Sequence, residues 1–200
     1  MNEDRDRAPR LATGIKPIIG RTLLKVAGWR LSGNPPQTKK YVIIAAPHTS
    51  NWDLIFLLAC AYAYGIDVSW MGKRSIFKFP FGGLMRALGG ISVDRSGPQN
   101  TVQQIVQVFD EKEALILAVP PSGTRSRRPY WKTGFYHIAH SAGVPIATSF
   151  LDYGTREAGF GHAIEPTGDI VADFERLRQF YGRCKGKFPE NTNDIKLKDS

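Results

Sequence analysis

Residues 41–58 read YVIIAAPHTSNWDLIFLL and join two apolar runs through a short polar segment. The first run is rich in β-branched residues and predicts a buried strand, and the second predicts a buried helix. The segment between them carries His48 and Asp53. The stretch therefore predicts a strand–loop–helix unit that holds an imidazole and a carboxylate at the carboxyl end of a buried strand.

The rest of the chain repeats this alternation. Strands are expected at 29–33, 40–46, 68–71, 89–95, 114–119, 144–151 and near 162–164, and helices at 17–28, 52–64, 76–88, 100–113, 130–142 and 170–181. Because the strands are continuous apolar runs, the pattern predicts an α/β fold, a single domain with a mainly parallel or mixed sheet flanked by helices. Ligand sites in such sheets gather at the carboxyl ends of strands.

We expect three parts along the chain: an N-terminal arm and amphipathic helix at 1–28, the domain proper at 29–184, and a polar tail at 185–200 that frays. One face of the helix carries apolar residues and one threonine, whereas its cations lie away from the centre of that face; the face consists of Ile18, Ile19, Thr22, Leu23 and Val26. A basic amphipathic helix can lie in a membrane interface, or its apolar face can pack on the domain. Both interpretations stay open.

Composition limits the class of protein. The 200 residues suit one domain, and 42% hydrophobic with 22% charged residues allow a real core. The net charge of +9 favours an anionic partner: nucleic acid, an anionic membrane surface or a phosphorylated substrate. The two cysteines, Cys60 and Cys184, form no paired motif, so neither a zinc site nor a disulfide framework is expected.

The expected location follows from two further features of the sequence. No apolar signal-peptide core follows the first ten residues, and the longest apolar run, 54–66, is shorter than the about 20 residues of a spanning helix. We therefore expect a cytoplasmic protein, peripheral on the inner face of the cell membrane.

The spacing of His48 and Asp53 lets them meet if His48 lies in the loop and Asp53 in the first helical turn. The carboxylate then holds one imidazole nitrogen and leaves the other as a general base. Ser50 or Asn51 is expected to cap the helix. The alternative is a capping arrangement in which the histidine is simply a satisfied structural group.

Two other strand ends carry groups suited to anions. Arg95 follows the strand 91–93, and a guanidinium there suits bidentate phosphate binding, unless it pairs with a neighbouring acid such as Asp94. The loop Ser122-Gly123-Thr124-Arg125 follows the strand 114–119 and combines adjacent amides with an arginine. No acidic residue occurs from 114 to 151. Positive charge is thus concentrated around one predicted edge of the sheet.

Taken in order, these blocks resemble the phospholipid/glycerol acyltransferase family, which includes the 1-acyl-glycerol-3-phosphate acyltransferases. His48 and Asp53 match its HxxxxD block, and residues 90–95 (GISVDR) are similar to its second block. Ser122-Gly123-Thr124-Arg125 resembles the third block, normally EGTR, and Val144-Pro145-Ile146 resembles the fourth. The resemblance covers roughly residues 28–151 and departs from the family at Ser122, where a glutamate is usual.

The resemblance implies a mechanism and its participants. An acceptor hydroxyl attacks an acyl thioester carried by coenzyme A or acyl carrier protein; His48 takes its proton and Asp53 orients His48. Arg95 and Arg125 would hold the acceptor's phosphate. Ser122, Gly123 and Thr124 would complete the acceptor site, and neither a metal nor a cofactor is implied.

The sequence therefore predicts an O-acyltransferase that acylates a lysophospholipid or related glycerolipid at an anionic membrane surface. An alternative, motivated by Ser122, is a catalytically impaired lipid-binding member of the same fold. A basic nucleic-acid-binding protein is a further alternative on charge alone, although no nucleic-acid motif supports it and no nucleic-acid partner is expected.

Overall fold

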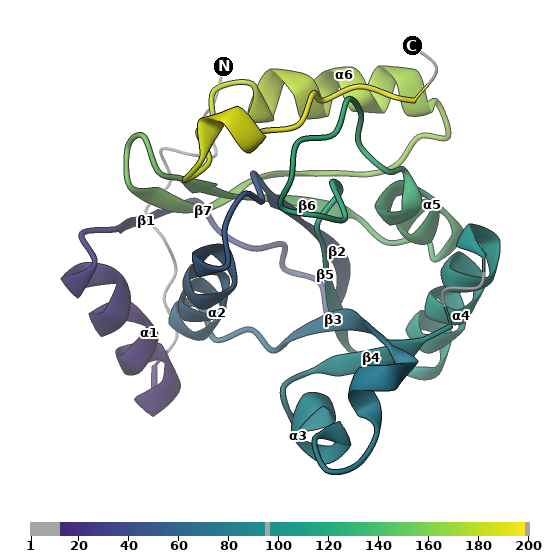
Figure 1. Cartoon of the computed structure of the whole chain (residues 1–200), viewed down its shortest axis with the longest axis horizontal. Helices are drawn as coiled ribbons and strands as arrows, with labels where there is room; N and C mark the ends of the chain where they lie inside the picture. Colours follow the sequence, from purple (N-terminus) through teal and green to yellow (C-terminus); the bar gives the residue numbers. More distant parts are fainter. Residues whose placement is uncertain (1–12, 95–96, 199–200) are drawn as a thin grey trace.

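The computed structural model describes residues 13–94 and 97–198 and contains one mixed sheet of seven strands (Figure 1). The strand order is β1-β7-β6-β2-β5-β3-β4. The strands are β1 (Arg30–Ser32), β2 (Lys40–Ala46), β3 (Val68–Lys73), β4 (Gly90–Val93), β5 (Leu115–Val119), β6 (Ile146–Asp152) and β7 (Glu157–Ile164). All neighbours pair in parallel except β6 and β7, so β1 and β7 run against the other five. The predicted α/β fold with a mainly parallel, mixed sheet is confirmed.

Helices cover both faces of the sheet (Figure 1). They are α1 (Ile15–Val26), α2 (Trp52–Tyr64), α3 (Gly82–Ala87), α4 (Pro98–Glu111), α5 (Gly134–Ser141) and α6 (Ile170–Tyr181), with short 3-10 turns η1 (Arg74–Phe77) and η2 (Pro189–Asn191). Successive side chains of β2 point to opposite faces of the sheet and so belong to two different hydrophobic cores. Val42 and Ile44 pack with α4, α5 and α6, whereas Tyr41 and Ile43 face the side of α2. Both sets are almost fully buried.

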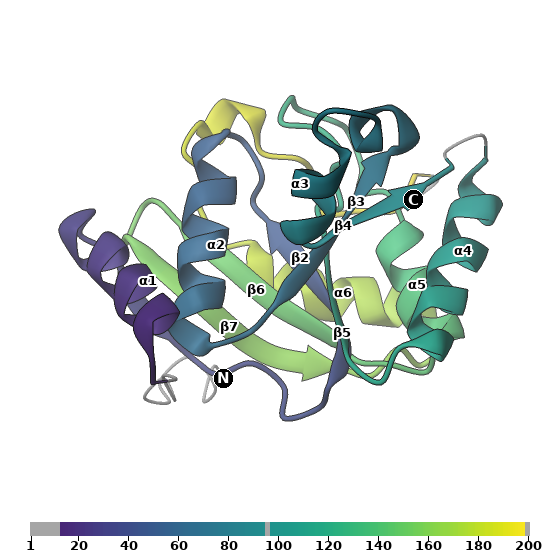
Figure 2. The same cartoon turned by 90° about the horizontal axis from the view of Figure 1, so that it is seen from below.

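Parallel pairing brings the loops that carry His48 and Arg125 to the same edge of the sheet. β6, β2 and β5 are neighbours in the middle of the sheet and run in the same direction, so their carboxyl ends meet at one edge. Figure 2 shows the β2–α2 and β5–α5 loops along the upper edge of the molecule, together with the C-terminal segment. This edge is where the candidate site lies.

Helix α1 packs on the domain, but not through its predicted apolar face. Its buried residues are Pro17, Gly20 and Leu24. Gly20 lies so close to α2 that an added Cβ would come 2.4 Å from the Ala59 carbonyl oxygen. Ile18 and Ile19 are left 51% and 52% exposed, because the close backbone contact at Gly20 turns that side of the helix away from α2.

The C-terminal segment, residues 185–198, was predicted to fray, and this prediction is wrong. Tyr153 N–H donates to the Lys185 carbonyl, Phe188 N–H to Thr49 Oγ1, and Trp131 N–H to the Lys196 carbonyl. A composition-based expectation of disorder fails here because backbone groups, which composition does not report, hold the segment. The predicted arm at 1–12 lies outside the described residues, as do positions 199–200.

Other expected elements shift at their ends. The predicted helix 130–142 begins only at Gly134, because the amides of Trp131 and Lys132 pair with distant carbonyls. The region expected to hold a strand near 162–164 forms the longer β7, antiparallel to β6. The predicted helix 76–88 is split into η1 and α3. Apart from Asp53, the buried residues of α2 lie in its second half, and residues of its first half line a cavity.

Candidate active site

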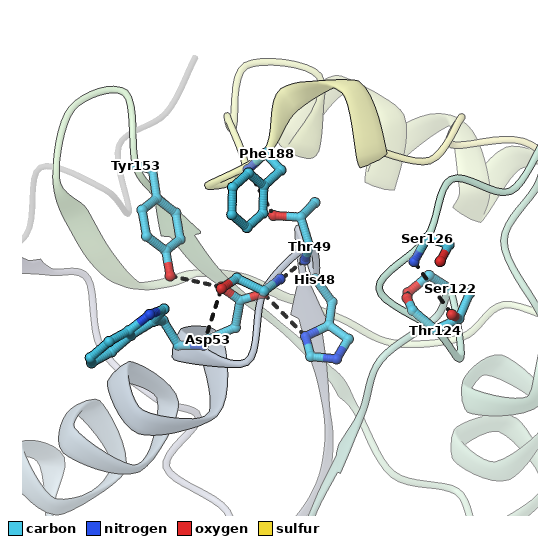
Figure 3. A network of polar contacts seen from close by, with 10 residues as sticks. His48, Thr49, Asp53, Ser122, Thr124, Ser126, Tyr153 and Phe188 are labelled. Carbon is cyan, nitrogen blue, oxygen red and sulfur yellow. Dashed lines mark hydrogen bonds and ion pairs between the residues drawn. The ribbon is translucent and has the colours of Figure 1, made fainter.

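His48 and Asp53 form a pair at the carboxyl end of β2 (Figure 3). The strand ends at Ala46 and α2 begins at Trp52, so Asp53 lies in the first helical turn and its carboxylate reaches back to the preceding loop. His48 Nδ1 lies 3.2 Å from Asp53 Oδ2. The His48 side chain is 22% exposed and that of Asp53 is 5% exposed, so the imidazole meets solvent while the carboxylate is buried behind it.

The carboxylate is also held by other donors. The amides of Thr49 and Ser50 donate to Asp53 Oδ2 at 2.8 and 2.9 Å, and the Tyr153 hydroxyl donates to Oδ1 at 2.7 Å. Burial alone would raise the pKa of Asp53, but the hydrogen bonds from His48, Tyr153, Ser50 and Thr49 outweigh it and lower the pKa below its usual value. Asp53 is therefore ionised at neutral pH.

This arrangement decides what the imidazole can do. Asp53 Oδ2 is an acceptor, so Nδ1 of the neutral ring carries the hydrogen and Nε2 carries the lone pair. Ser50 Oγ accepts from Trp52 N–H and so caps the start of α2, whereas Asn51 makes no side-chain cap bond. Capping and the His–Asp pair thus coexist, and His48 itself is not needed for the cap.

The loop after β5 lies beside His48, and the hydroxyl groups of this loop form hydrogen bonds within the loop itself. Ser122 is buried, and its hydroxyl donates to the Thr124 carbonyl at 2.7 Å; Thr124 Oγ1 accepts from Ser126 N–H (Figure 3). Gly123 has φ +62°, a conformation that favours glycine at this turn. The Ser122 hydroxyl proton is thus committed to its own turn, which argues against a nucleophilic role.

A large apolar cavity opens beside the His–Asp pair. Its volume is about 700 Å³, and its polar lining includes His48, Asp53 and Arg125. The remaining wall is mainly apolar and comes from α2, β2, β3, α3, β5, β6 and β7. It includes Leu54, Leu57, Leu58, Ile43, Ile66, Val68, Trp70, Leu88, Ala118, Phe150, Leu151 and Phe160. The structure therefore places a His–Asp pair and a guanidinium on an apolar cavity.

The structure brings some predicted site residues together and separates others. His48, Asp53 and Arg125 share the large cavity, whereas Ser122 does not line it. Ser122 lines a separate small recess together with His48, Trp131, Thr192 and Asn193. Gly123 and Thr124 belong to the same loop without lining the large cavity. Arg95 lies outside the described residues, so its phosphate contact stays a prediction.

The interpretation of the sequence missed two parts of the site. Tyr153 follows the carboxyl end of β6, next to β2, and touches Asp53 directly. Thr192 and Asn193 come from the C-terminal segment. The strand-end rule that found His48 could have found Tyr153, whereas no local signal marks Asn193. Within residues 13–94 and 97–198, no group of three or more His, Cys, Asp or Glu side chains is placed to hold a metal ion.

The fold and site define a class of α/β protein with a His–Asp pair at the carboxyl edge of the sheet and an apolar cavity beside it. Residues 30–151 match the family described as Acyltransferase, and the chain belongs to this family.

Named relatives agree with this assignment. A 1-acyl-sn-glycerol-3-phosphate acyltransferase of Haemophilus influenzae is 31% identical over 135 residues, which cover 62% of this chain and 54% of that protein. The enzyme of the same name from Escherichia coli is 32% identical over 122 residues, covering 56% of this chain and 48% of that protein. The chain thus spans about half the length of these curated relatives.

A solved structure has the same fold. The crystal structure of the 1-acyl-sn-glycerophosphate acyltransferase of Thermotoga maritima superposes with a TM-score of 0.55 at 17% identity. The match covers 84% of this chain and 73% of that one. At this identity the likeness concerns the fold.

Proposed function

We propose that this protein is an O-acyltransferase that moves a fatty acyl group from a thioester to the hydroxyl of a lysophospholipid or related glycerolipid. The observation that carries the proposal is the shared cavity, in which His48, Asp53 and Arg125 lie beside a large apolar wall. The names of the relatives agree with it. An apolar chain, a reacting hydroxyl and an anionic group each have a matching surface in this cavity.

In the proposed reaction the acceptor hydroxyl attacks the thioester carbonyl and loses its proton to His48 Nε2. Asp53, ionised and buried, holds Nδ1–H and stabilises the imidazolium that forms. Collapse of the tetrahedral intermediate breaks the carbon–sulfur bond, and the leaving thiolate takes the proton from His48 to become the free thiol. General-base catalysis of this kind contributes about 10²–10⁴-fold. The donor is acyl-CoA or acyl carrier protein, used as a substrate, and no cofactor takes part.

The acceptor's phosphate is proposed to bind Arg125, whose guanidinium is exposed at the cavity. Arg95 is proposed as a second contact on its sequence context alone. Ser122, Gly123 and Thr124 shape the loop that carries Arg125. Because serine supplies neither the charge nor the length of the glutamate usual in the family, we propose that the position of Ser122 tunes the choice of acceptor.

We further propose that the protein works on the surface of an anionic membrane, at the inner face of the cell membrane. Exposed apolar side chains gather on the helices beside the cavity: Ile15, Ile18, Ile19 and Val26 on α1, Trp52, Leu54 and Ile55 on α2, and Phe79, Phe81, Leu84 and Leu88 around α3. Leu54, Ile55 and Leu88 also line the cavity. No helix of the described residues is long and apolar enough to cross a membrane.

The test is release of free thiol from acyl-CoA and acyl carrier donors in the presence of a panel of lysolipids. Wild-type protein should turn over with at least one pair, and His48→Ala should lower kcat by at least about 10²-fold. His137→Ala, on the exposed side of α5, is the matched control and should leave turnover unchanged. Lipid binding without turnover for any pair would instead favour the catalytically impaired alternative.

A further inference from the structure

We propose that Tyr153 is a positioning residue of the reaction: its hydroxyl fixes the second oxygen of Asp53 and thereby sets the orientation and charge of the His–Asp pair. The proposal rests on the proposed acyltransfer function and extends it. Tyr153 lies beyond residues 30–151, which match the family, so its role is argued from this structure alone.

The geometry divides the donors between the two carboxylate oxygens. Oδ2 receives His48 Nδ1 and the amides of Thr49 and Ser50, whereas Oδ1 receives the Tyr153 hydroxyl at 2.7 Å (Figure 3). Without the phenol, Oδ1 loses the hydrogen bond that anchors it, and the carboxylate can rotate about its Cβ–Cγ bond. Because the imidazole depends on Oδ2, such a rotation would also release His48.

Tyr153 is itself held on several sides. Its ring packs edge-on against Trp29, with centroids 4.9 Å apart, and against Phe56 at 6.2 Å. Its backbone N–H donates to the Lys185 carbonyl at 2.9 Å, and Asp152 Oδ1 accepts from the amides of Gly154 and Lys185. The phenol is therefore presented to Asp53 by a rigid aromatic cluster and by the C-terminal segment.

The direction of this hydrogen bond is also fixed. Burial, followed by the hydrogen bond to Asp53 and the charge of that carboxylate, raises the pKa of Tyr153. The phenol stays protonated throughout the catalytic range, so it donates and Asp53 accepts. During the reaction the hydroxyl proton of the acceptor goes to His48 Nε2, and the proton of Tyr153 stays where it is. Tyr153 acts only through Asp53.

The variant Tyr153→Phe keeps the ring and removes the hydroxyl. Since the hydroxyl makes a hydrogen bond to a charged group, its loss should lower kcat by about 10- to 100-fold while KM stays within about twofold. Loss of the donor also raises the proton affinity of the His–Asp pair. The acid limb of the pH–rate profile should therefore move to higher pH, a change that a merely structural role would not produce.

Tyr64→Phe is the matched control. The Tyr64 hydroxyl is also a buried donor, but it binds the carbonyls of Ser32 and Gly33, away from the pair. Tyr64→Phe should lower the free energy of unfolding about as much as Tyr153→Phe does, but it should leave the pH–rate profile unchanged. A Tyr153→Phe variant with wild-type kcat and an unmoved acid limb would overturn the proposal.

A second experiment does not depend on measuring turnover. 3-Fluorotyrosine at position 153 keeps the side chain but makes the phenol a stronger donor, and ¹³C-NMR of Asp53 reads the carboxylate directly. The pKa of Asp53 should be lower with fluorotyrosine and higher in Tyr153→Phe than in the wild type. The same Asp53 titration in all three proteins would refute the positioning role even if no thiol were released, whereas the expected order without turnover would overturn only the proposed function.

Discussion

At the scale of the residue, Asp53 is the group whose environment does most to define the site. A carboxylate with a side chain 5% exposed would ordinarily favour its neutral form, yet three kinds of donor reverse this. Backbone amides, an imidazole and a phenol each supply a hydrogen bond, so the charge is retained without a neighbouring lysine or arginine in the hydrogen-bond set. An ionised carboxylate hydrogen-bonded to Nδ1 would stabilise the imidazolium that forms if His48 acts as a base.

The lowered pKa of Asp53 predicts how stability depends on pH. Its folded pKa is below the unfolded value of about 3.9, so its contribution is fully present above that value and is lost as pH falls through the folded pKa. Asp53→Asn should therefore be less stable than wild type at neutral pH and should lose less stability on acidification from about pH 5 to pH 3. Urea unfolding across this range measures it.

The control for this prediction is Asp110→Asn at an exposed position of α4. It should unfold with the same pH dependence as the wild type. A steeper acid loss in Asp53→Asn than in the wild type would contradict the lowered pKa.

At the scale of the element, the C-terminal segment acts as a strap over the loops of the site. It contacts the β2–α2 loop at Thr49, the loop after β6 at Tyr153 and the loop after β5 at Trp131. Lys187 adds a cation–π contact to Trp52, with its nitrogen 5.0 Å from the ring centroid. A polar segment is thus ordered by backbone hydrogen bonds to three separate strand ends.

Gly186 is the residue that lets this segment approach. A Cβ there would lie 2.7 Å from both Oγ1 and Cγ2 of Thr49, a buried β-branched side chain with little room to move. Gly186→Ala should therefore cost about 1–3 kcal/mol of unfolding free energy and reduce turnover. Gly134→Ala is the matched control, because nothing lies within 4 Å of its added Cβ. Equal urea midpoints for the two variants would contradict the close packing of the strap.

At the scale of the whole molecule, the exposed apolar side chains of α1 and α2 and the large cavity lie on the same side of the sheet. The sheet separates α4, α5 and α6 from α1 and α2 (Figure 1), and the apolar wall of the cavity comes largely from α2 and the sheet beneath it. A lipid chain could thus enter the cavity directly from a bilayer that rests on α1, α2 and α3. The net charge of +9 would favour an anionic bilayer.

Membrane binding through α1 can be tested with vesicles that contain phosphatidylglycerol. Burying one isoleucine is worth about 1.5–3 kcal/mol, so Ile18→Ser with Ile19→Ser should weaken partitioning at least about tenfold in a sedimentation assay. Val171→Ser is the control, since Val171 is 66% exposed on α6, across the sheet. Partitioning that falls equally in both proteins, or in neither, would contradict a membrane-facing α1.

The sequence by itself determined the α/β class, most element positions, the strand-end placement of His48 and the loop with Arg125. These follow from local physics: apolar periodicity, the turn residues, and the rule that ligands gather at strand ends. It left open whether the apolar face of α1 packs on the domain, and the structure leaves that face exposed because Gly20 docks another face on α2. The expectation that the polar tail frays failed for residues 185–198.

Only the tertiary structure decided which groups share a site. Tyr153 reaches Asp53 because β6 pairs with β2, Asn193 lines a recess with His48 because the chain folds back, and Arg125 but not Ser122 lies on the large cavity. These residues are far apart in the sequence: His48 and Asn193, which line the same recess, are 145 positions apart. Such contacts depend on strand order and chain direction, and no local run of sequence encodes either.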